Sequence, residues 1–363
     1  MIYIHVPFCH CKCTYCAFYS KPVGMQWQPS LYVDALLAEI EYRRDEQAHP
    51  IQTVYFGGGT PSILPVGELA RIVGGLRRSF DLSALKEATI ECNPEDLTVD
   101  YLAALRDMLF FNRISIGIQS LNDDVLRTIG RRHTAVQAIK AVENVRAAGF
   151  DNVSVDFIYG IVPGLGFEVP DSLLSMVSHV SAYSLTVEPG TALERQVEQG
   201  RVVLPDDEET VRQYYAVHER LEAAGFKQYE ISNYARHGFR SQHNSRYWNR
   251  TPYLGLGPAA HSFDGAVRRW NTSSVEAYMS NPTGSFDSER LTHADAYNEL
   301  LMTALRTTDG LSVSDVTVAE RERLQSQMQQ FIDCGWIEVA SGRYSPTPDG
   351  LLHADGIAAA LFV

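Results

Sequence analysis

The sequence lacks the features that mark secreted, membrane-spanning and nucleic-acid-binding proteins. It has six cysteines in 363 residues, and no apolar run approaches the roughly 18 residues of a transmembrane helix. Residues 1–5 lack the basic start and the apolar stretch of a signal peptide. Acidic residues outnumber basic ones, 44 to 31, and the formal charge of −13 argues against sequence-independent binding to nucleic acid. We therefore expect a cytoplasmic protein without a membrane anchor.

The few cysteines are concentrated in one place. Cys9, Cys11, Cys13 and Cys16 fall within eight residues, directly after the first predicted strand. In a reducing compartment such a group indicates metal ligation or redox chemistry rather than disulfides. The spacing C-x3-C-x2-C of Cys9, Cys13 and Cys16 favours three thiolates on an iron–sulfur cluster, with one iron open to another ligand. The alternative is a structural zinc site, which needs four closed ligands and would also use Cys11.

Six short runs rich in β-branched and aromatic residues alternate with longer amphipathic segments. The runs are apolar on both faces, as in the strands of a parallel sheet covered by helices. They span residues 2–5, 53–56, 88–92, 113–118, 153–157 and 182–186. Helices are predicted from a cap at Ser30 and over residues 66–78, 99–108, 135–148 and 208–224. Six strand–helix units predict a parallel α/β fold, either a full or partial barrel or an open sheet.

The pattern changes near residue 225. Residues 226–263 are rich in aromatic residues, glycine, asparagine and histidine, and residues 280–285 have the composition of a linker. Helices are then predicted over 296–307 and 316–334, followed by a strand over 336–340 and a wing over 342–347. We therefore predict three segments: an α/β core over 1–225, an aromatic and glycine-rich extension over 226–285, and a small, mostly helical, winged-helix-like domain over 286–363.

Polar residues lie at the carboxyl ends of several predicted strands, and these ends form the binding face of a parallel α/β fold. A glycine run at 57–59 follows the second strand, and Glu91, Gln119 and Asp156 end the next three. Glycines let a ligand approach the backbone, although many such turns carry them for steric reasons alone. A carboxylate suits a ribose or an ammonium group, and the guanidinium of Arg131 suits a carboxylate. The ordinary alternative for each residue is a capping or solvated role.

The cysteine spacing, together with Tyr-Ile-His-Val-Pro-Phe-Cys at residues 3–9, resembles the signature of the radical S-adenosylmethionine (SAM) superfamily. The resemblance implies a partial (β/α)6 TIM-like barrel, a 4Fe–4S cluster held by Cys9, Cys13 and Cys16, and SAM on the open iron. Cys11 is then a bystander. The strand-end residues resemble the SAM contacts of the coproporphyrinogen-dehydrogenase-like subfamily. The contacts implied are Tyr3, Gly58, Gly59, Thr60, Glu91, Gln119, Arg131 and Asp156.

Two functions compete within that subfamily. One is an oxygen-independent coproporphyrinogen III dehydrogenase of porphyrin biosynthesis, and the other is a haem chaperone that binds haem and hands it on. Three features resemble the chaperones: the first strand starts the chain, Phe18 replaces a further cysteine of the enzyme, and residues 243–248 match the motif HNxxYW. We therefore predict a haem chaperone, with the dehydrogenase as the alternative.

The HNxxYW segment also has chemistry suited to haem, which needs an axial ligand, commonly histidine, and apolar walls. His243 is the predicted haem ligand and His261 a second candidate, while Arg240 or Arg246 suits a propionate. The ordinary alternative for His243 is a structural histidine packed between aromatic residues. The predicted partners are haem, SAM and an acceptor such as a haem-containing respiratory protein. The resemblance also makes a homodimer an expectation.

Two segments depart from the pattern of the subfamily. The crossover between residues 163–164 and Val180 leaves room for about two to three helical turns. Residues 108–112 lack the glycine expected before the fourth strand, so Leu109 or Phe110 must occupy a position where a helix end prefers glycine. The two remaining cysteines, Cys92 and Cys334, are predicted to be buried.

Overall fold

The computed structural model, which describes residues 1–24, 27–47 and 49–363, is built around one nine-stranded sheet. The strand order is β11-β1-β4-β5-β6-β7-β8-β10-β9. Six consecutive neighbours in this order are parallel. They are β1 (Ile2–Val6), β4 (Thr53–Gly58), β5 (Glu87–Cys92), β6 (Arg113–Gln119), β7 (Asn152–Tyr159) and β8 (His179–Ser184). The predicted parallel α/β core is confirmed, and only the last strand was placed about three residues too late.

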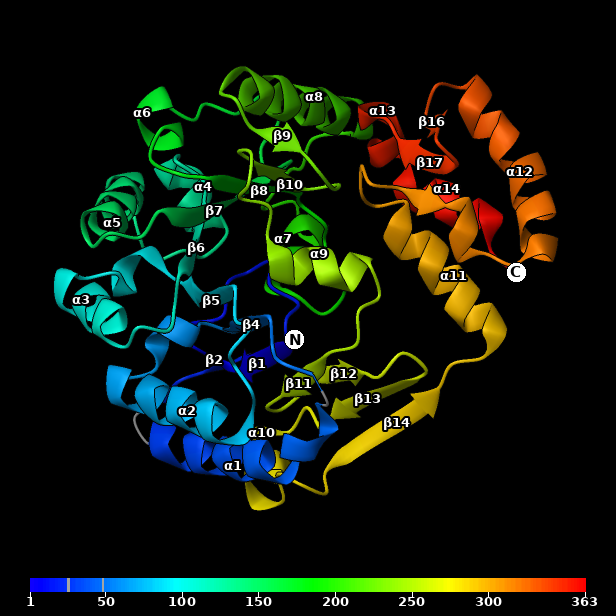
Figure 1. Ribbon diagram of the computed structural model, residues 1–363. Helices are drawn as coiled ribbons and strands as arrows, with labels where there is room; N and C mark the ends of the chain where they lie inside the picture. Colours follow the sequence, from blue (N-terminus) through cyan, green and yellow to red (C-terminus); the bar gives the residue numbers. More distant parts are fainter. Residues whose placement is uncertain (25–26, 48) are drawn as a thin grey trace.

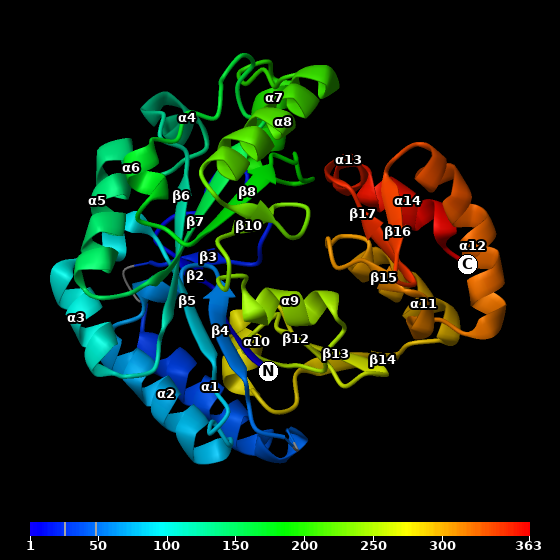
Figure 2. The same ribbon diagram turned by 45° about the horizontal axis from the view of Figure 1, so that its top comes forward.

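The sheet curves into a partial barrel with two separate edges (Figures 1 and 2). At one edge β11 (Leu254–Leu256) pairs in parallel with β1. At the other, β10 (Asn233–Ala235) pairs antiparallel with β8 and with the edge strand β9 (Lys227–Gln228). No pairing joins β11 to β9 among the described residues, so the barrel stays open, in agreement with the predicted partial (β/α)6 barrel.

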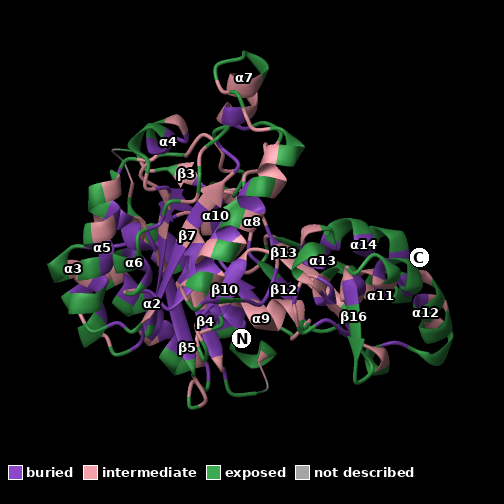
Figure 3. Ribbon diagram, turned by 90° about the horizontal axis from the view of Figure 1, so that it is seen from above, coloured by how far each residue is buried: buried purple, intermediate pink, exposed green. Residues whose placement is uncertain are grey.

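Helices cover the outer face of the sheet, and Figure 3 shows buried strands beneath helices that expose one side. Several begin at a side-chain cap that satisfies free backbone amides: Thr134 and Gln137 form a capping box on α5, and Asp206 caps α8. The helices are α1 (Pro29–Tyr42), α2 (Val66–Ser79), α3 (Val99–Asp107), α4 (Asp123–Thr128), α5 (Ala135–Ala147), α6 (Asp171–Leu174) and α8 (Asp207–Ala223). Helix α7 (Ala192–Glu198) projects away from the sheet in Figure 3 and contacts the cysteine loop, where the Leu193 amide donates to the Thr14 carbonyl at 2.8 Å.

Three local predictions can be compared with these elements. Leu109 has a φ of +49° and an 83% exposed side chain, so it does occupy the left-handed position that a glycine would favour. The crossover helix α6 has four residues, about one turn, and is shorter than predicted. Ser30 is not the cap of α1, because the helix begins at Pro29 and the N-cap is Gln28; proline suits a first helical turn.

The segment after the barrel adds helix α9 (Gln242–Trp248), a three-stranded antiparallel sheet and helix α10 (Val275–Ser280). The sheet consists of β12 (His261–Phe263), β13 (Val267–Asn271) and β14 (Phe286–Arg290). Because β14 pairs with β13, residues 286–290 share a sheet with the middle segment. The three-segment division remains a prediction.

The C-terminal part has its own hydrophobic core, formed by residues such as Leu301, Met328 and Leu361. A small sheet packs beside four helices and includes the predicted wing. These elements are α11 (His293–Ala304), β15 (Leu311–Ser312), α12 (Val318–Asp333), β16 (Ile337–Ala340), β17 (Arg343–Pro346), α13 (Pro348–Leu352) and α14 (Ala354–Leu361). Cys334 caps the end of α12 and is exposed, so its predicted burial was wrong, whereas Cys92 is buried.

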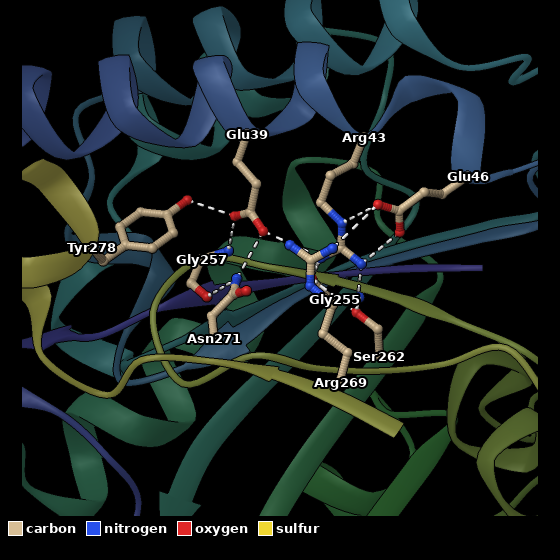
Figure 4. A network of polar contacts seen from close by, with 9 residues as sticks. All are labelled: Glu39, Arg43, Glu46, Gly255, Gly257, Ser262, Arg269, Asn271 and Tyr278. Carbon is tan, nitrogen blue, oxygen red and sulfur yellow. Dashed lines mark hydrogen bonds and ion pairs between the residues drawn. The ribbon is translucent and has the colours of Figure 1, made fainter. Parts of the chain in front are cut away.

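A buried ionic network fastens the middle segment to helix α1 (Figure 4). Glu39 and Arg43, both almost fully buried, pair at 3.2 Å, and the Arg43 Nη1 donates to the Gly255 carbonyl at 2.9 Å. Glu39 also accepts hydrogen bonds from the Tyr278 hydroxyl at 2.6 Å and the Asn271 amide at 2.7 Å. A core tolerates such a network when all of its polar groups are paired, but removal of one partner leaves a buried charge unpaired. The network therefore holds β11 in place against β1.

None of the helices in the described residues combines the length and the apolarity needed to cross a membrane.

Candidate functional site

A cavity of about 430 Å³ opens at the carboxyl ends of the parallel strands. Its size is within the range of small-molecule and cofactor sites. Most of the site residues predicted from sequence line it, although they come from distant parts of the chain. They are Cys9, Cys13, Cys16, Gly58, Gly59, Thr60, Glu91, Gln119, Arg131 and Asp156. Tyr3 and His243 are absent from the lining residues.

The cysteine loop is held against the barrel by backbone hydrogen bonds. Its first thiol lies on β2 (Phe8–Cys9), which pairs with β3 (Lys21–Pro22) beyond the loop. The Cys16 amide donates to the Cys13 carbonyl at 3.3 Å, and the Thr14 amide donates to the Ile129 carbonyl at 3.1 Å. These hydrogen bonds hold the cysteine loop at the carboxyl ends of the barrel strands.

The donor set of this loop fits a cluster better than a single metal ion. Across residues 1–24, 27–47 and 49–363, no three His, Cys, Asp or Glu side chains are placed to share one ion. A mononuclear zinc site needs such convergence, whereas thiolates of a 4Fe–4S cluster each bind a different iron. Cys9, Cys13 and Cys16 are partly buried in the cavity wall, while Cys11 is exposed with its Sγ 4.0 Å from the Gly130 carbonyl. The Sγ of Cys9 accepts a hydrogen bond from Thr60 Oγ1 at 3.4 Å.

The glycine run at the end of β4 allows that strand to pack closely against β1 and β2. Gly58 has a φ of +109°, and a Cβ there would lie 2.6 Å from the ring of His5. A Cβ at Gly59 would lie 2.5 Å from the Phe8 carbonyl oxygen. The glycines therefore have a steric reason within the protein itself, and they line the cavity as well.

Two carboxyl groups, Glu91 on β5 and Asp156 on β7, line the cavity. Burial raises the pKa of Glu91 to about 7 and the charge of Asp156 acts in the same direction, while hydrogen bonds from Tyr55 and the Gly58 amide lower it. The Tyr55 hydroxyl donates to Glu91 Oε1 at 2.7 Å, and the Gly58 amide donates to Oε2 at 3.2 Å. Burial also raises the pKa of Asp156, to about 6, against opposing hydrogen bonds from Ser181 and Ser115. Both groups therefore change charge near neutral pH.

Arg131 and Gln119 complete the polar wall. The guanidinium of Arg131 donates to Asn93 Oδ1 and to the Gly117 carbonyl, both at 2.7 Å, and lies 3.5 Å from the Cys13 Sγ. Its Nε is buried, and the described residues offer it no hydrogen-bond partner. Gln119 follows a bulge in β6 and has a φ of +68°, a conformation uncommon outside glycine and often found at functional sites.

Tyr3 lies one layer behind the cavity. Its hydroxyl bonds His5 Nδ1 at 3.0 Å, and its ring stacks on Tyr55 with the centroids 6.2 Å apart. Two further residues of this region were not predicted: Tyr55, which has the pattern of an ordinary strand residue, and Tyr183, which lines the cavity. Tyr183 could have been predicted from the sequence, because it is polar and lies near the end of a parallel strand, as Glu91 and Asp156 do.

The HNxxYW segment forms helix α9, which packs against the amino-terminal half of β4. His243 is fully buried: Nδ1 is 2.9 Å from Thr53 Oγ1, and Nε2 is 3.2 Å from the Tyr247 hydroxyl. Burial lowers the pKa of His243 to about 3, helped by the nearby positive charges of the amino terminus and Arg246. This geometry matches the structural alternative for His243. Haem ligation by His243 stays a prediction. It requires helix α9 to move away from β4, because both ring nitrogens of His243 are hydrogen-bonded.

The other proposed haem contacts lie on the surface around this helix. His261 is exposed, and within the described residues its ring makes no hydrogen bond; it stacks on Trp270 with centroids 6.0 Å apart. Arg246 donates to Gln52 Oε1 at 2.5 Å, and Arg240 pairs with Asp309 at 3.0 Å. Of the two histidine candidates, only His261 therefore presents an accessible ring nitrogen. His10, which follows the first cysteine of the loop, is partly buried, and its Nε2 lies 3.1 Å from Asp96 Oδ1.

Two family profiles match the chain. The profile of the Radical SAM superfamily matches residues 3–168, and the profile described as HemN C-terminal domain matches residues 291–353. The first covers the cysteine loop and the first five of the six parallel strands, β1 and β4 to β7. The second begins just after β14.

Curated relatives match over nearly the whole chain. The Heme chaperone HemW of Mycobacterium tuberculosis is 35% identical over 98% of this chain and 93% of its own length. That of Bacillus subtilis is 34% identical over 85% of this chain and 84% of its own. The mitochondrial Radical S-adenosyl methionine domain-containing protein 1 of Danio rerio is 34% identical over 86% of this chain and 73% of its own.

A solved structure shares the fold. It is described as the coproporphyrinogen III oxidase HemN from Escherichia coli, a radical SAM enzyme, and it superposes with a TM-score of 0.84 over 100% of this chain and 89% of that one. The two are 23% identical, so the likeness establishes the architecture alone. Together with the near-full-length relatives, these matches show that the chain belongs to the HemW family of radical SAM proteins.

Proposed function

We propose that this protein is a haem chaperone that binds a 4Fe–4S cluster, SAM and haem and delivers the haem to an acceptor protein. The observation that carries the proposal is the similarity to proteins named Heme chaperone HemW over 98% of the chain. Membership of the radical SAM superfamily implies the cluster and SAM. The strand-end cavity supports this, because three cysteines and the polar strand ends meet there.

Each cavity residue has a proposed role that suits its chemistry. Cys9, Cys13 and Cys16 hold the cluster, which when bound supplies the electron for cleavage of SAM. Glu91 and Asp156 accept hydrogen bonds from the ribose or the ammonium group of SAM. The buried Nε of Arg131 donates to a carboxylate, the kind of acceptor that a guanidinium favours.

The remaining predicted contacts are proposed to shape the same site. Gly58, Gly59 and Thr60 bring the backbone of β4 close to SAM, and Gln119 contacts the ribose. Tyr3 lies behind the wall and is proposed to act through Tyr55, on which its ring stacks.

The alternative function is oxidative decarboxylation of coproporphyrinogen III. The fold alone does not separate the two, because the enzyme HemN has the same architecture. Phe18 favours the chaperone: its ring is 71% exposed at the mouth of the cavity, where the enzyme resemblance calls for a further cysteine. The domain division and the cytoplasmic location are further proposals, which rest on the sequence pattern. A respiratory haem protein as acceptor and a homodimer are proposals that rest on the family resemblance.

One anaerobic experiment tests the proposed function. The protein is reconstituted with iron and sulfide, and SAM and haem are then added, separately and together. We expect stoichiometric haem binding with a defined Soret band and no protoporphyrinogen IX when coproporphyrinogen III is supplied. Product formation would support the dehydrogenase, and a failure to bind haem would overturn the chaperone proposal.

The haem ligand is tested with two matched histidine variants, His243→Gln and His261→Ala. His261 and Trp270 face each other across β12 and β13, and Arg268, opposite Phe263, lies on the same face of the sheet. This face offers an accessible imidazole and an aromatic surface, and its cation, Arg268, is already paired with Glu299 at 2.7 Å. If His261 is the ligand, its variant alone changes the Soret position; a change confined to His243→Gln would support the opening of α9.

A further inference from the structure

The ring of Tyr55 connects the strand-end cavity to the HNxxYW helix. Its hydroxyl donates to Glu91 Oε1 at 2.7 Å, and Glu91 lines the cavity. Its ring lies against His243 with the centroids 5.2 Å apart and an interplanar angle of 33°. Because side chains point to alternate faces of a strand, Thr53 and Tyr55 lie on the same face of β4, and His243 contacts both. Tyr55 therefore links the motif to Glu91, a residue of the cavity wall.

His243 is held by hydrogen bonds at both ring nitrogens and at its backbone amide. Both ring nitrogens are hydrogen-bonded, to Thr53 and Tyr247, and its backbone amide donates to Glu87 Oε1 at 2.9 Å. Tyr247 packs edge-on against Tyr253 with the centroids 4.8 Å apart. In a close-packed interior a ring held in this way limits the positions open to its neighbour. The orientation of Tyr55, and so the hydrogen bond to Glu91, depends on where helix α9 lies.

We infer that Tyr55 is a positioning residue for Glu91, and that His243 acts through Tyr55 to couple helix α9 to the affinity of the cavity for SAM. The inference rests on the proposed function, in which Glu91 contacts SAM. It gives the histidine of HNxxYW a role at the SAM site that does not require haem.

The groups that face Glu91 determine how this coupling can be measured. Asp156 from β7 and the phenols of Tyr3 and Tyr183, from β1 and β8, lie around it, and the Gly58 amide is its second donor. A hydrogen bond from Tyr55 favours the ionised carboxylate. Without it the pKa of Glu91 rises further, so a ligand that needs the carboxylate ionised binds well only at higher pH.

The test is the pH dependence of SAM affinity, measured by anaerobic calorimetry on reconstituted protein between pH 6 and 9. We expect Tyr55→Phe to weaken SAM binding at pH 6.5 by about three- to tenfold and to recover most of the affinity at pH 8.5. His243→Gln should shift the profile in the same direction by a smaller amount. The double variant should resemble Tyr55→Phe, because both changes act on one contact.

The matched control is Tyr278→Phe, which also removes a buried phenol that donates to a carboxylate, Glu39, but at the ionic network on α1. Its SAM profile should match that of the wild type. Infrared titration of the Glu91 carboxyl in the SAM-free protein gives a second measure, and Tyr55→Phe should raise that pKa. If the wild type binds SAM while the Tyr55→Phe and His243→Gln profiles superimpose on it, the inference is wrong. If the wild type does not bind SAM, the proposed function fails as well.

Discussion

The two ends of the barrel have opposite characters. At the carboxyl ends of the strands, Glu91, Asp156 and Arg131 surround a cavity, and the Arg131 Nε has no partner among the residues described. At the amino ends, the buried groups of helix α9 and its neighbours are paired: His243 with Thr53 and Tyr247, and Glu87 with two backbone amides of α9. The Nε of Arg113, at the start of β6, is an exception and has no partner among the described residues. A second buried histidine at that end, His179, is likewise bonded on both ring nitrogens.

This difference separates groups arranged for a ligand from groups arranged for packing. Polar atoms that a cavity leaves without partners are costly in the empty protein, and a bound ligand satisfies them. Polar atoms that are fully paired stabilise the fold, and removal of a partner leaves a buried group unsatisfied. Stability measurements should therefore respond in opposite directions at the two ends.

The largest expected effect is at the cysteine loop. Cys13→Ala should abolish binding of a stable 4Fe–4S cluster, because two thiolates remain where the spacing supplies three. The broad absorbance of the cluster near about 400 nm, together with iron and sulfide content after anaerobic reconstitution, measures this. Cys11→Ser is the control and should retain the cluster, since Cys11 is exposed on the rim. Equal losses in both variants would make Cys11 a ligand.

The next largest effect is a loss of stability at the amino ends of the strands, where His243 is buried. His243→Ala should reduce the free energy of unfolding by about 2–4 kcal/mol, because it leaves Thr53 and Tyr247 unsatisfied and opens a cavity beside Tyr55. Urea unfolding at pH 7.5 measures it. His261→Ala, at an exposed site without hydrogen bonds among the described residues, should change stability by less than about 0.5 kcal/mol. A cost at His243 no larger than at His261 would refute the packing role of α9.

At the carboxyl ends of the strands, replacing a buried cavity residue should increase the stability of the protein. The pKa of Glu91 is raised in the folded state to about 7 from 4.5, so its contribution to stability is present below pH 4.5 and is lost as pH rises through about 7. Glu91→Gln should therefore stabilise the ligand-free protein at pH 8 by about 1–3 kcal/mol. The gain should shrink toward zero near pH 4.5. Destabilisation at pH 8 would show that Glu91 supports the fold.

The smallest effect tests a turn that enters the amino end of β6. Leu109 has a φ of +49° and an exposed side chain, so Leu109→Gly should stabilise the protein by about 0.5–1 kcal/mol. Val136→Gly, at an exposed position within helix α5, should destabilise it by about the same amount. Thermal unfolding of both variants measures the contrast, and a loss of stability in Leu109→Gly would contradict it.

The same contrast explains what could be predicted from the sequence. Strand ends gather at one edge of a parallel sheet, so Glu91, Gln119 and Asp156 could be placed together from order alone, and the departure at Leu109 could be located from a missing glycine. The position of His243 could not be predicted, because its burial depends on helix α9 packing on Thr53 and Tyr55, which lie about 190 residues earlier in the chain. Cys334 was misplaced because an apolar residue at a helix end carries no signal of which side it faces.

The most direct test of the account is the electron paramagnetic resonance spectrum of the reduced, reconstituted protein before and after SAM is added. The account places SAM on an iron that Cys9, Cys13 and Cys16 leave open, at the ligand-binding end of the barrel. It predicts that SAM changes the spectrum of the cluster, and that His261→Ala preserves this change while Glu91→Ala weakens it. A spectrum that is identical with and without SAM would contradict the central claim.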